Sequence, residues 1–137
     1  MLFRSKTLVG YIQHKTGTSH NSFSELNAQY LEPAKGIRWQ KKVCVLTNRS
    51  TYSAANEFVK YMKTLGATII GDKTGGGAGM PFSSELPNGW GVRFSACPMY
   101  DSQHNSTEFG IEPTIKVDIK SSDFQKQVDT KIGRAHV

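Results

Sequence analysis

Hydrophobic residues change their spacing around residue 53, from a short continuous run to a helical repeat. Residues 43–46 (VCVL) are all apolar, which predicts a short strand that is fully buried. Beyond residue 53 apolar side chains recur every three or four positions, which predicts an amphipathic helix over residues 54–65 that ends at Gly66. Residues 67–70 form a second apolar run, so the pattern predicts a strand–helix–strand unit.

Weaker patterns flank this unit. Residues 7–13 are typical of a strand, and the polar residues 14–33 predict a long loop. The Pro-Asn-Gly sequence at residues 87–89 predicts a tight turn that joins strands over residues 82–86 and 90–96. A strand over residues 115–119 and a short helix that begins at Ser121 or Ser122 and carries Phe124 and Val128 are expected to follow. The predicted fold class is therefore α/β, with a strand–helix–strand unit and a β-hairpin.

Ser53 lies where the first strand of this unit gives way to the helix. Serine is a preferred helix N-cap, so a capping role is the simplest interpretation. A serine on such a turn can also expose its hydroxyl as a nucleophile, beside backbone N–H groups that bind an oxyanion. The glycine-flanked elbow motif of many esterases is absent here. The local sequence leaves both interpretations open.

Composition and charge exclude several classes of protein. The chain has 137 residues, of which 37% are hydrophobic and 20% charged, and this is ordinary for a globular domain. Its formal net charge of +6 comes from scattered residues, because Lys41-Lys42 is the one adjacent basic pair, so we expect a solvated surface and no nucleic-acid partner. Cys44 and Cys97 give neither a disulfide framework nor metal-ligand spacing, so we expect no metal and no cofactor.

A glycine cluster follows the second strand at residues 71–79 (GDKTGGGAG). It lacks the ending of a phosphate-binding loop and the spacing of a dinucleotide site. A flexible turn is one interpretation. Because glycine has no side chain, Gly75, Gly76 and Gly77 could also approach a ligand closely.

Four segments occur in the order of one known family. They are TNRSTYSAANE at residues 47–57, IGDKTGGG at 70–77, LPNGW at 86–90 and EFGIEP at 108–113. Together they resemble the C-terminal part of the tail-specific (C-terminal processing) serine proteases, nearest to the branch of the tricorn core protease and the retinoid-binding-protein-like repeats. The resemblance implies a truncated crotonase-like (Clp-protease-like) core.

The resemblance also implies roles for particular residues. Ser53 matches the nucleophile, the Ala54 amide an oxyanion donor, and the glycines at 75–77 a loop that binds substrate. The processing-protease branch uses a Ser/Lys dyad, but Gly77 or Ala78 stands where its lysine is found. Glu108 matches the glutamate of the tricorn-like branch, which orients the catalytic histidine. An exposed carboxylate without a catalytic role is the alternative for Glu108.

No base for Ser53 is apparent in the sequence. His14, His20 and His104 do not match the family's base position, and Lys73 lies earlier than the family's lysine. We therefore expect the base, and a second oxyanion donor, to come from an upstream segment. A serine without a base is a weak nucleophile, so the isolated chain is expected to have little or no activity.

Both ends of the chain differ in character from the rest. Residues 1–5 (MLFRS) and 132–137 (IGRAHV) resemble translated ends of common sequencing adapters, so we interpret them as non-native. Residues 6–131 are then expected to be the C-terminal portion of a protease catalytic domain. The expected function is a serine-type peptidase that forms an acyl-enzyme with peptide or protein substrates, and the family implies export to the periplasm or cell envelope. Two alternatives on the same fold are a non-catalytic module that binds peptides or apolar ligands, and a crotonase-type acyl-CoA enzyme.

Overall fold

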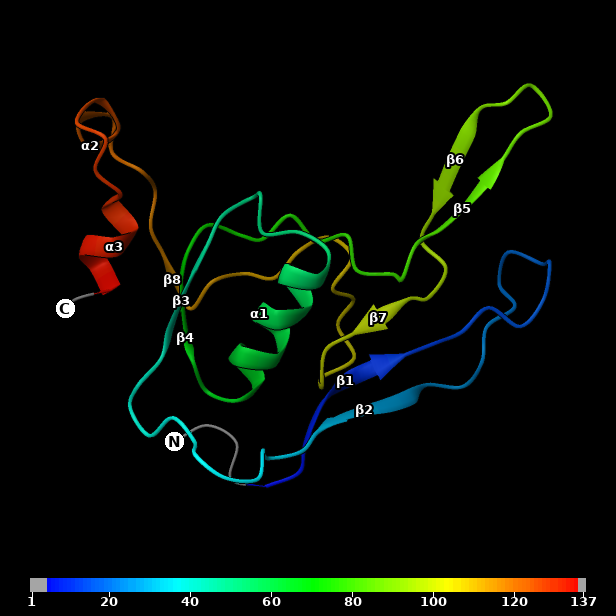
Figure 1. The fold of residues 1–137 in the computed structure, drawn as a ribbon, viewed down its shortest axis with the longest axis horizontal. Helices are drawn as coiled ribbons and strands as arrows, with labels where there is room; N and C mark the ends of the chain where they lie inside the picture. Colours follow the sequence, from blue (N-terminus) through cyan, green and yellow to red (C-terminus); the bar gives the residue numbers. More distant parts are fainter. Residues whose placement is uncertain (1–4, 136–137) are drawn as a thin grey trace.

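The computed structural model describes residues 5–135. Figure 1 shows helix α1 in the middle of the molecule. The elements follow in the order β1 (Thr7–Ile12), β2 (Asn27–Leu31), β3 (Cys44–Thr47), α1 (Ala54–Thr64), β4 (Thr68–Gly71), β5 (Phe82–Glu85), β6 (Gly91–Phe94), β7 (Met99–Tyr100), β8 (Ile115–Lys116), α2 (Ser121–Gln125) and α3 (Thr130–Ala135). The strands form three sheets in the described chain, with orders β2-β1-β7, β3-β4-β8 and β5-β6. The predicted α/β class is confirmed at this level.

The strand–helix–strand unit is the part that carries Ser53, and it forms as predicted. Strands β3 and β4 pair in parallel, and β8 adds to β4 in parallel. Helix α1 buries Val59 and Met62 against Ile69 of β4, in one apolar cluster. Gly66 ends the helix with a φ of 89°, a conformation that glycine adopts at low cost.

A second sheet packs beside this unit. Strand β1 pairs antiparallel with β2 on one side and with β7 on the other. Ile12 and Met99 from this sheet pack with Ala78, which follows the glycine cluster, and with Cys97. This second cluster anchors the chain on both sides of the β5–β6 hairpin.

The structure corrects several sequence predictions. The predicted loop over residues 14–33 contains β2, and β7 was not predicted. Strand β3 is at a sheet edge in the described chain and is not fully buried, and its Cys44 is exposed. The last predicted strand is shorter, since β8 ends at Lys116, and Val128 lies outside α2.

The predicted non-native ends overlap the described residues only in part. Helix α3 includes residues 132–135, while residues 1–4 and 136–137 lie outside the described residues. The assignment of both ends as adapter-derived stays a prediction. None of the described helices is long and apolar enough to cross a membrane.

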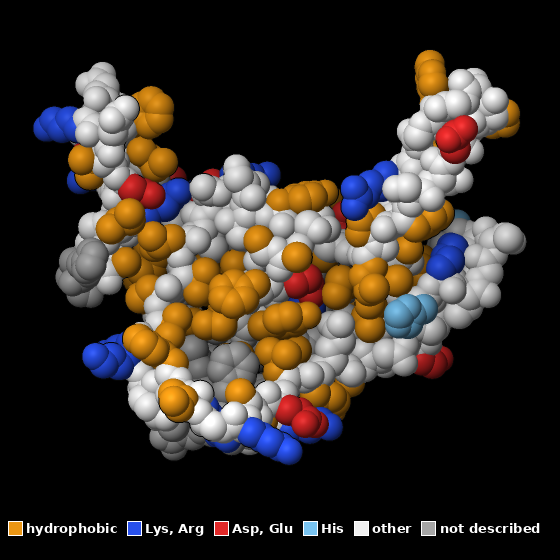
Figure 2. All heavy atoms as spheres, in the orientation of Figure 1, with side chains coloured by type: hydrophobic (Ala, Val, Ile, Leu, Met, Phe, Trp, Pro, Cys, Tyr) orange, Lys and Arg blue, Asp and Glu red, His pale blue; other side chains and the backbone are white. Residues whose placement is uncertain are grey.

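The β5–β6 hairpin projects from the body of the molecule (Figure 1). Both of its strands are largely exposed, and the rings of Phe82 and Phe94 face one another across them at 5.6 Å. Hydrophobic side chains also gather across the middle of the face seen in Figure 2, where α1 lies. Phe58, one of the apolar residues at helical spacing in α1, is nevertheless 53% exposed.

Candidate active site

Ser53 precedes helix α1 in a backbone conformation that residues other than glycine rarely adopt. Its φ of 59° and ψ of −123° correspond to the first central position of a type II′ turn, where glycine dominates. The Ser53 side chain makes no capping hydrogen bond to the helix. The capping interpretation is therefore wrong for this hydroxyl, which makes no hydrogen bond within residues 5–135.

Backbone hydrogen bonds to the glycine cluster hold this turn in place. The Ser53 N–H donates to the Gly76 carbonyl at 2.8 Å, and the Gly75 N–H donates to the Thr51 carbonyl at 2.8 Å. Tyr52 and Gly76 thus form an isolated parallel bridge. Strained conformations persist where the surrounding structure fixes them, and this bridge supplies that restraint.

The N–H of Ala54, the first residue of α1, has no hydrogen-bond acceptor within residues 5–135. Two of the next three amides are paired, since the Ala55 N–H donates to the Tyr52 carbonyl at 3.2 Å and the Glu57 N–H to the Ser53 carbonyl at 3.1 Å. The positive end of the helix dipole lies at the same place. A free donor beside the Ser53 hydroxyl is the arrangement that an oxyanion requires.

The glycine cluster lies against the protein's own backbone and side chains. Gly76 has a φ of 77°, and a Cβ there would collide with the Glu108 carbonyl. A Cβ on Gly77 would collide with the ring of Tyr52. Close internal packing therefore accounts for these two glycines. Their contact with substrate stays a prediction.

Glu108 lies on a loop that is tied to the same glycines. Its carbonyl accepts a hydrogen bond from the Gly77 N–H at 2.9 Å, and its own N–H donates to the Ser106 hydroxyl at 3.3 Å. The half-buried carboxylate has no hydrogen bond or ion pair among the described residues. The structure thus joins Ser53, Gly76, Gly77 and Glu108 through consecutive backbone contacts.

The histidines and Lys73 contact other groups. The His14 Nδ1 atom lies 3.6 Å from the Cys97 sulfur, and His20 lies 2.8 Å from the Asn21 side-chain oxygen. The ring of His104 stacks on Tyr11 at 4.4 Å, and Lys73 pairs with Glu112 at 3.2 Å. No hydrogen bond joins any of these groups to Ser53 in the described chain. Residues 5–135 contain no group of three or more His, Cys, Asp or Glu side chains that could hold a metal ion.

A buried polar cluster behind the site was not predicted from the sequence. Its fully or nearly buried members are Asn56, Lys60, Thr74 and Thr107. Asn56 and Lys60 are four residues apart and share the inner face of α1, so their helical phase was a signal available in the sequence. Burial, and then the nearby Glu57 carboxylate, raise the pKa of the adjacent Tyr61 hydroxyl.

Residues 1–117 match the model of peptidase family S41. The chain belongs to peptidase family S41. The resemblance drawn from the four sequence segments is confirmed, and the chain is part of a peptidase domain. A crystal structure of a putative peptidase from Parabacteroides merdae shares 51% sequence identity with it at a TM-score of 0.92, over 98% of this chain and 43% of that one.

More distant S41 structures share the fold. Mature CPAF complexed with lactacystin is 21% identical at a TM-score of 0.72, over 77% of this chain and 22% of that one. The photosystem II D1 C-terminal processing protease is 18% identical at a TM-score of 0.59, over 85% of this chain and 29% of that one.

A relative found by sequence comparison is an uncharacterized protein of Chlamydia muridarum. It is 26% identical over 102 residues, which are 69% of this chain and 17% of that protein. This S41 chain therefore spans less than half the length of each of these relatives.

Proposed function

We propose that Ser53 is the nucleophile of a serine peptidase whose catalytic domain includes this chain and a further segment that supplies the base. The strained Ser53 backbone, with a hydroxyl that caps nothing, is the observation that carries the proposal. A conformation that costs about 1–3 kcal/mol is typical of functional sites, since folding alone gains nothing from it. The free Ala54 N–H beside it supports the same chemistry.

The proposed reaction is acyl transfer. The Ser53 oxygen attacks the carbonyl carbon of a peptide bond while a base from outside the described residues takes the hydroxyl proton. The Ala54 N–H donates to the oxyanion of the tetrahedral intermediate. The protonated base then gives its proton to the departing amine, and water releases the acyl group from Ser53 by the same steps in reverse.

Glu108 completes the proposal as a residue that orients the base. Its carboxylate is free among the described residues and lies on a loop fixed to the glycines behind Ser53. A carboxylate in that position can accept a hydrogen bond from an imidazole and stabilise its charged form. This role, and the absence of a lysine from positions 77 and 78, favour the tricorn-like branch over the branch with a Ser/Lys dyad.

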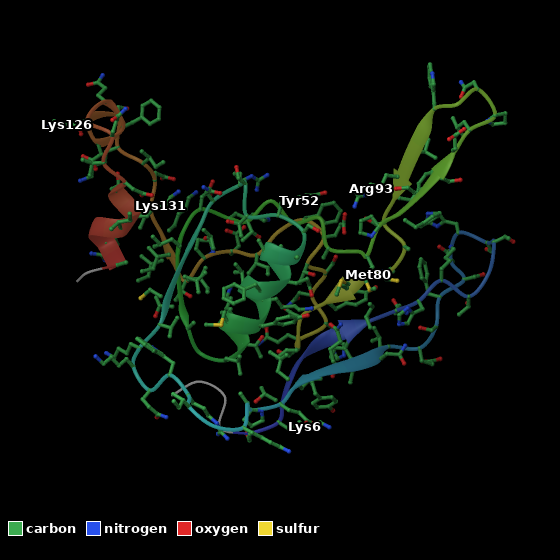
Figure 3. The ribbon with its side chains drawn as sticks, in the orientation of Figure 1. Lys6, Tyr52, Met80, Arg93, Lys126 and Lys131 are labelled. Carbon is green, nitrogen blue, oxygen red and sulfur yellow. The ribbon has the colours of Figure 1, made fainter. Side chains whose placement is uncertain are left out.

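Peptide or protein chains are the proposed substrates. The glycine loop would approach the substrate backbone, and the hairpin that follows it would lie beside the bound substrate. In Figure 3 Tyr52 lies at the start of α1, and Met80 and Arg93 lie at the base of the hairpin. Tyr52 and Met80 are 59% and 60% exposed, so apolar surface is available to a substrate there. A non-catalytic binding module is the weaker proposal, because binding alone does not call for strain at Ser53.

Active-site labelling tests this proposal. A fluorophosphonate probe is expected to modify the full-length protein at Ser53, and Ser53→Ala is expected to abolish the labelling. Ser50→Ala, in the same turn, is the matched control and should leave labelling intact, because Ser50 is exposed and its hydroxyl makes no hydrogen bond within the described residues. Equal labelling of wild type and Ser53→Ala would show that the nucleophile is another residue.

A further inference from the structure

Two buried side chains, Asn56 and Thr74, and the backbone carbonyl of Thr107 form a continuous hydrogen-bonded chain behind Ser53. Asn56 and Thr74 are 0% exposed and Thr107 is 2% exposed. The Thr74 hydroxyl donates to the Asn56 side-chain oxygen at 2.6 Å. The Asn56 side-chain nitrogen donates to the Thr107 carbonyl at 3.1 Å.

Each group in this chain has one consistent orientation. The Thr74 hydroxyl accepts from the Ile111 N–H at 2.6 Å, so its own proton is available for Asn56. Because the Asn56 oxygen accepts from Thr74, its nitrogen must face the Thr107 carbonyl. Thr74 and Ile111 are also joined through their backbones, by a bond of 3.1 Å from the Thr74 N–H. All of these buried polar groups are thereby satisfied, as stable burial requires.

This hydrogen-bonded chain of side chains links the three segments that the proposed mechanism uses. Asn56 lies within one helical turn of Ser53, and the Ser53 carbonyl accepts a hydrogen bond from the Glu57 N–H of α1. Thr74 immediately precedes the glycines that hold the Ser53 turn. Thr107 immediately precedes Glu108. The buried side-chain amide of Asn56 therefore fixes the positions of the glycine loop and the Glu108 loop relative to the nucleophile.

We propose that Asn56 and Thr74 are positioning residues that set the Glu108 loop in register with Ser53. The inference rests on the proposed function, because it gives Glu108 a catalytic neighbour to orient. An apolar pair of similar volume would also fill this space, but it would define no single orientation for residues 107–111. A fully satisfied polar chain does define one, and a small displacement of catalytic groups has a large effect on rate.

Thr74→Val in the full-length protein tests the inference. Valine keeps the shape of threonine but leaves the Asn56 oxygen and the Ile111 N–H without partners. We expect kcat to fall by roughly 100-fold with KM within about twofold. The acidic limb of the kcat/KM profile should move to lower pH, because a displaced Glu108 stabilises the protonated base less well. Thr74→Ser keeps the hydroxyl and should restore kcat to within about threefold.

Two further measurements separate positioning from general destabilisation. Amide hydrogen exchange in Thr74→Val should accelerate at residues 107–111 and 76–77 before it accelerates in β4. Tyr100→Phe is the matched control, since it also removes a hydroxyl, which donates to the Gln13 side chain at 2.8 Å in the other sheet. It should leave kcat and the pH profile unchanged. If Thr74→Val does not fold, Asn56→Asp replaces it, because a carboxylate oxygen would then face the Thr107 carbonyl.

The outcomes distinguish this inference from the function on which it rests. An active wild type labelled at Ser53, with a Thr74→Val variant of unchanged kcat and pH profile, overturns the positioning role alone. Unchanged exchange at residues 107–111 overturns it whether or not the protein is active. A folded Thr74→Ser variant that loses kcat as Thr74→Val does also overturns it, since the hydroxyl is then not the cause. A wild type that is not labelled at Ser53 overturns the proposed function instead.

Discussion

Replacing Ser53 with glycine is expected to stabilise the protein while it abolishes activity. The φ of 59° and ψ of −123° at Ser53 suit glycine, so relief of about 1–3 kcal/mol of strain should exceed the roughly 0.5–1 kcal/mol that glycine costs through the unfolded state. The serine hydroxyl makes no capping bond, so its loss adds no penalty. We expect a net gain of about 1 kcal/mol in the free energy of unfolding, measured by urea denaturation of the full-length protein. Peptidase activity should fall by about 10⁶-fold in kcat.

Ser50→Gly provides the matched control for this prediction. Ser50 lies in the same turn but does not have a positive φ, so glycine there should lower the free energy of unfolding by about 0.5–1 kcal/mol. The two glycine substitutions should therefore change stability in opposite directions. A Ser53→Gly variant destabilised as much as Ser50→Gly would mean that Ser53 stabilises the turn after all, as a cap does. A variant that keeps its activity would exclude Ser53 as the nucleophile.

Hydrophobic spacing predicted the elements whose side chains lie on a well-defined face. Helix α1 and strand β4 have such faces, and both were predicted within one or two residues. Strand β2 has the sequence NAQYL at a sheet edge and is half exposed, so no alternation indicated it. Strand β7 has only two residues and forms by pairing with β1, which no local pattern reveals. What was missed is held by tertiary contacts.

The candidate site follows the same division. Ser53 and Glu108 were predicted as site residues from their place in ordered motifs, and the structure brings their loops together. The strain at Ser53 and the free Ala54 N–H are properties of backbone geometry, which the residue types do not specify. Lys60 lies between the apolar positions of the helical pattern, and its burial was not predicted from the sequence, because lysine is rarely buried without a partner. Its partner is Glu57, three residues earlier on the same helix.

Lys60→Met is expected to destabilise the protein by about 3–5 kcal/mol, because it leaves a carboxylate buried without its countercharge. The Lys60 side chain is 1% exposed, and its nitrogen lies 2.6 Å from a Glu57 carboxylate oxygen. That oxygen is buried and has no well-aligned hydrogen bond within the described residues, so the neighbouring positive charge is what stabilises it. The same lysine nitrogen donates to the Gln29 side chain at 3.3 Å and to the Tyr100 carbonyl at 3.4 Å, which ties α1 to the second sheet.

The same substitution at Lys6 is the control. Lys6 pairs with Glu32 at 3.4 Å, but both side chains are more than half exposed, so Lys6→Met should change the free energy of unfolding by less than about 1 kcal/mol. The double variant Lys60→Met with Glu57→Gln should recover about 2 kcal/mol of the loss, since the amide removes the uncompensated charge. Urea unfolding of the wild type, Lys60→Met, Glu57→Gln and the double variant measures this coupling. If the double variant is no more stable than Lys60→Met, the lysine acts through its contacts to Gln29 and Tyr100 and not through the charge of Glu57.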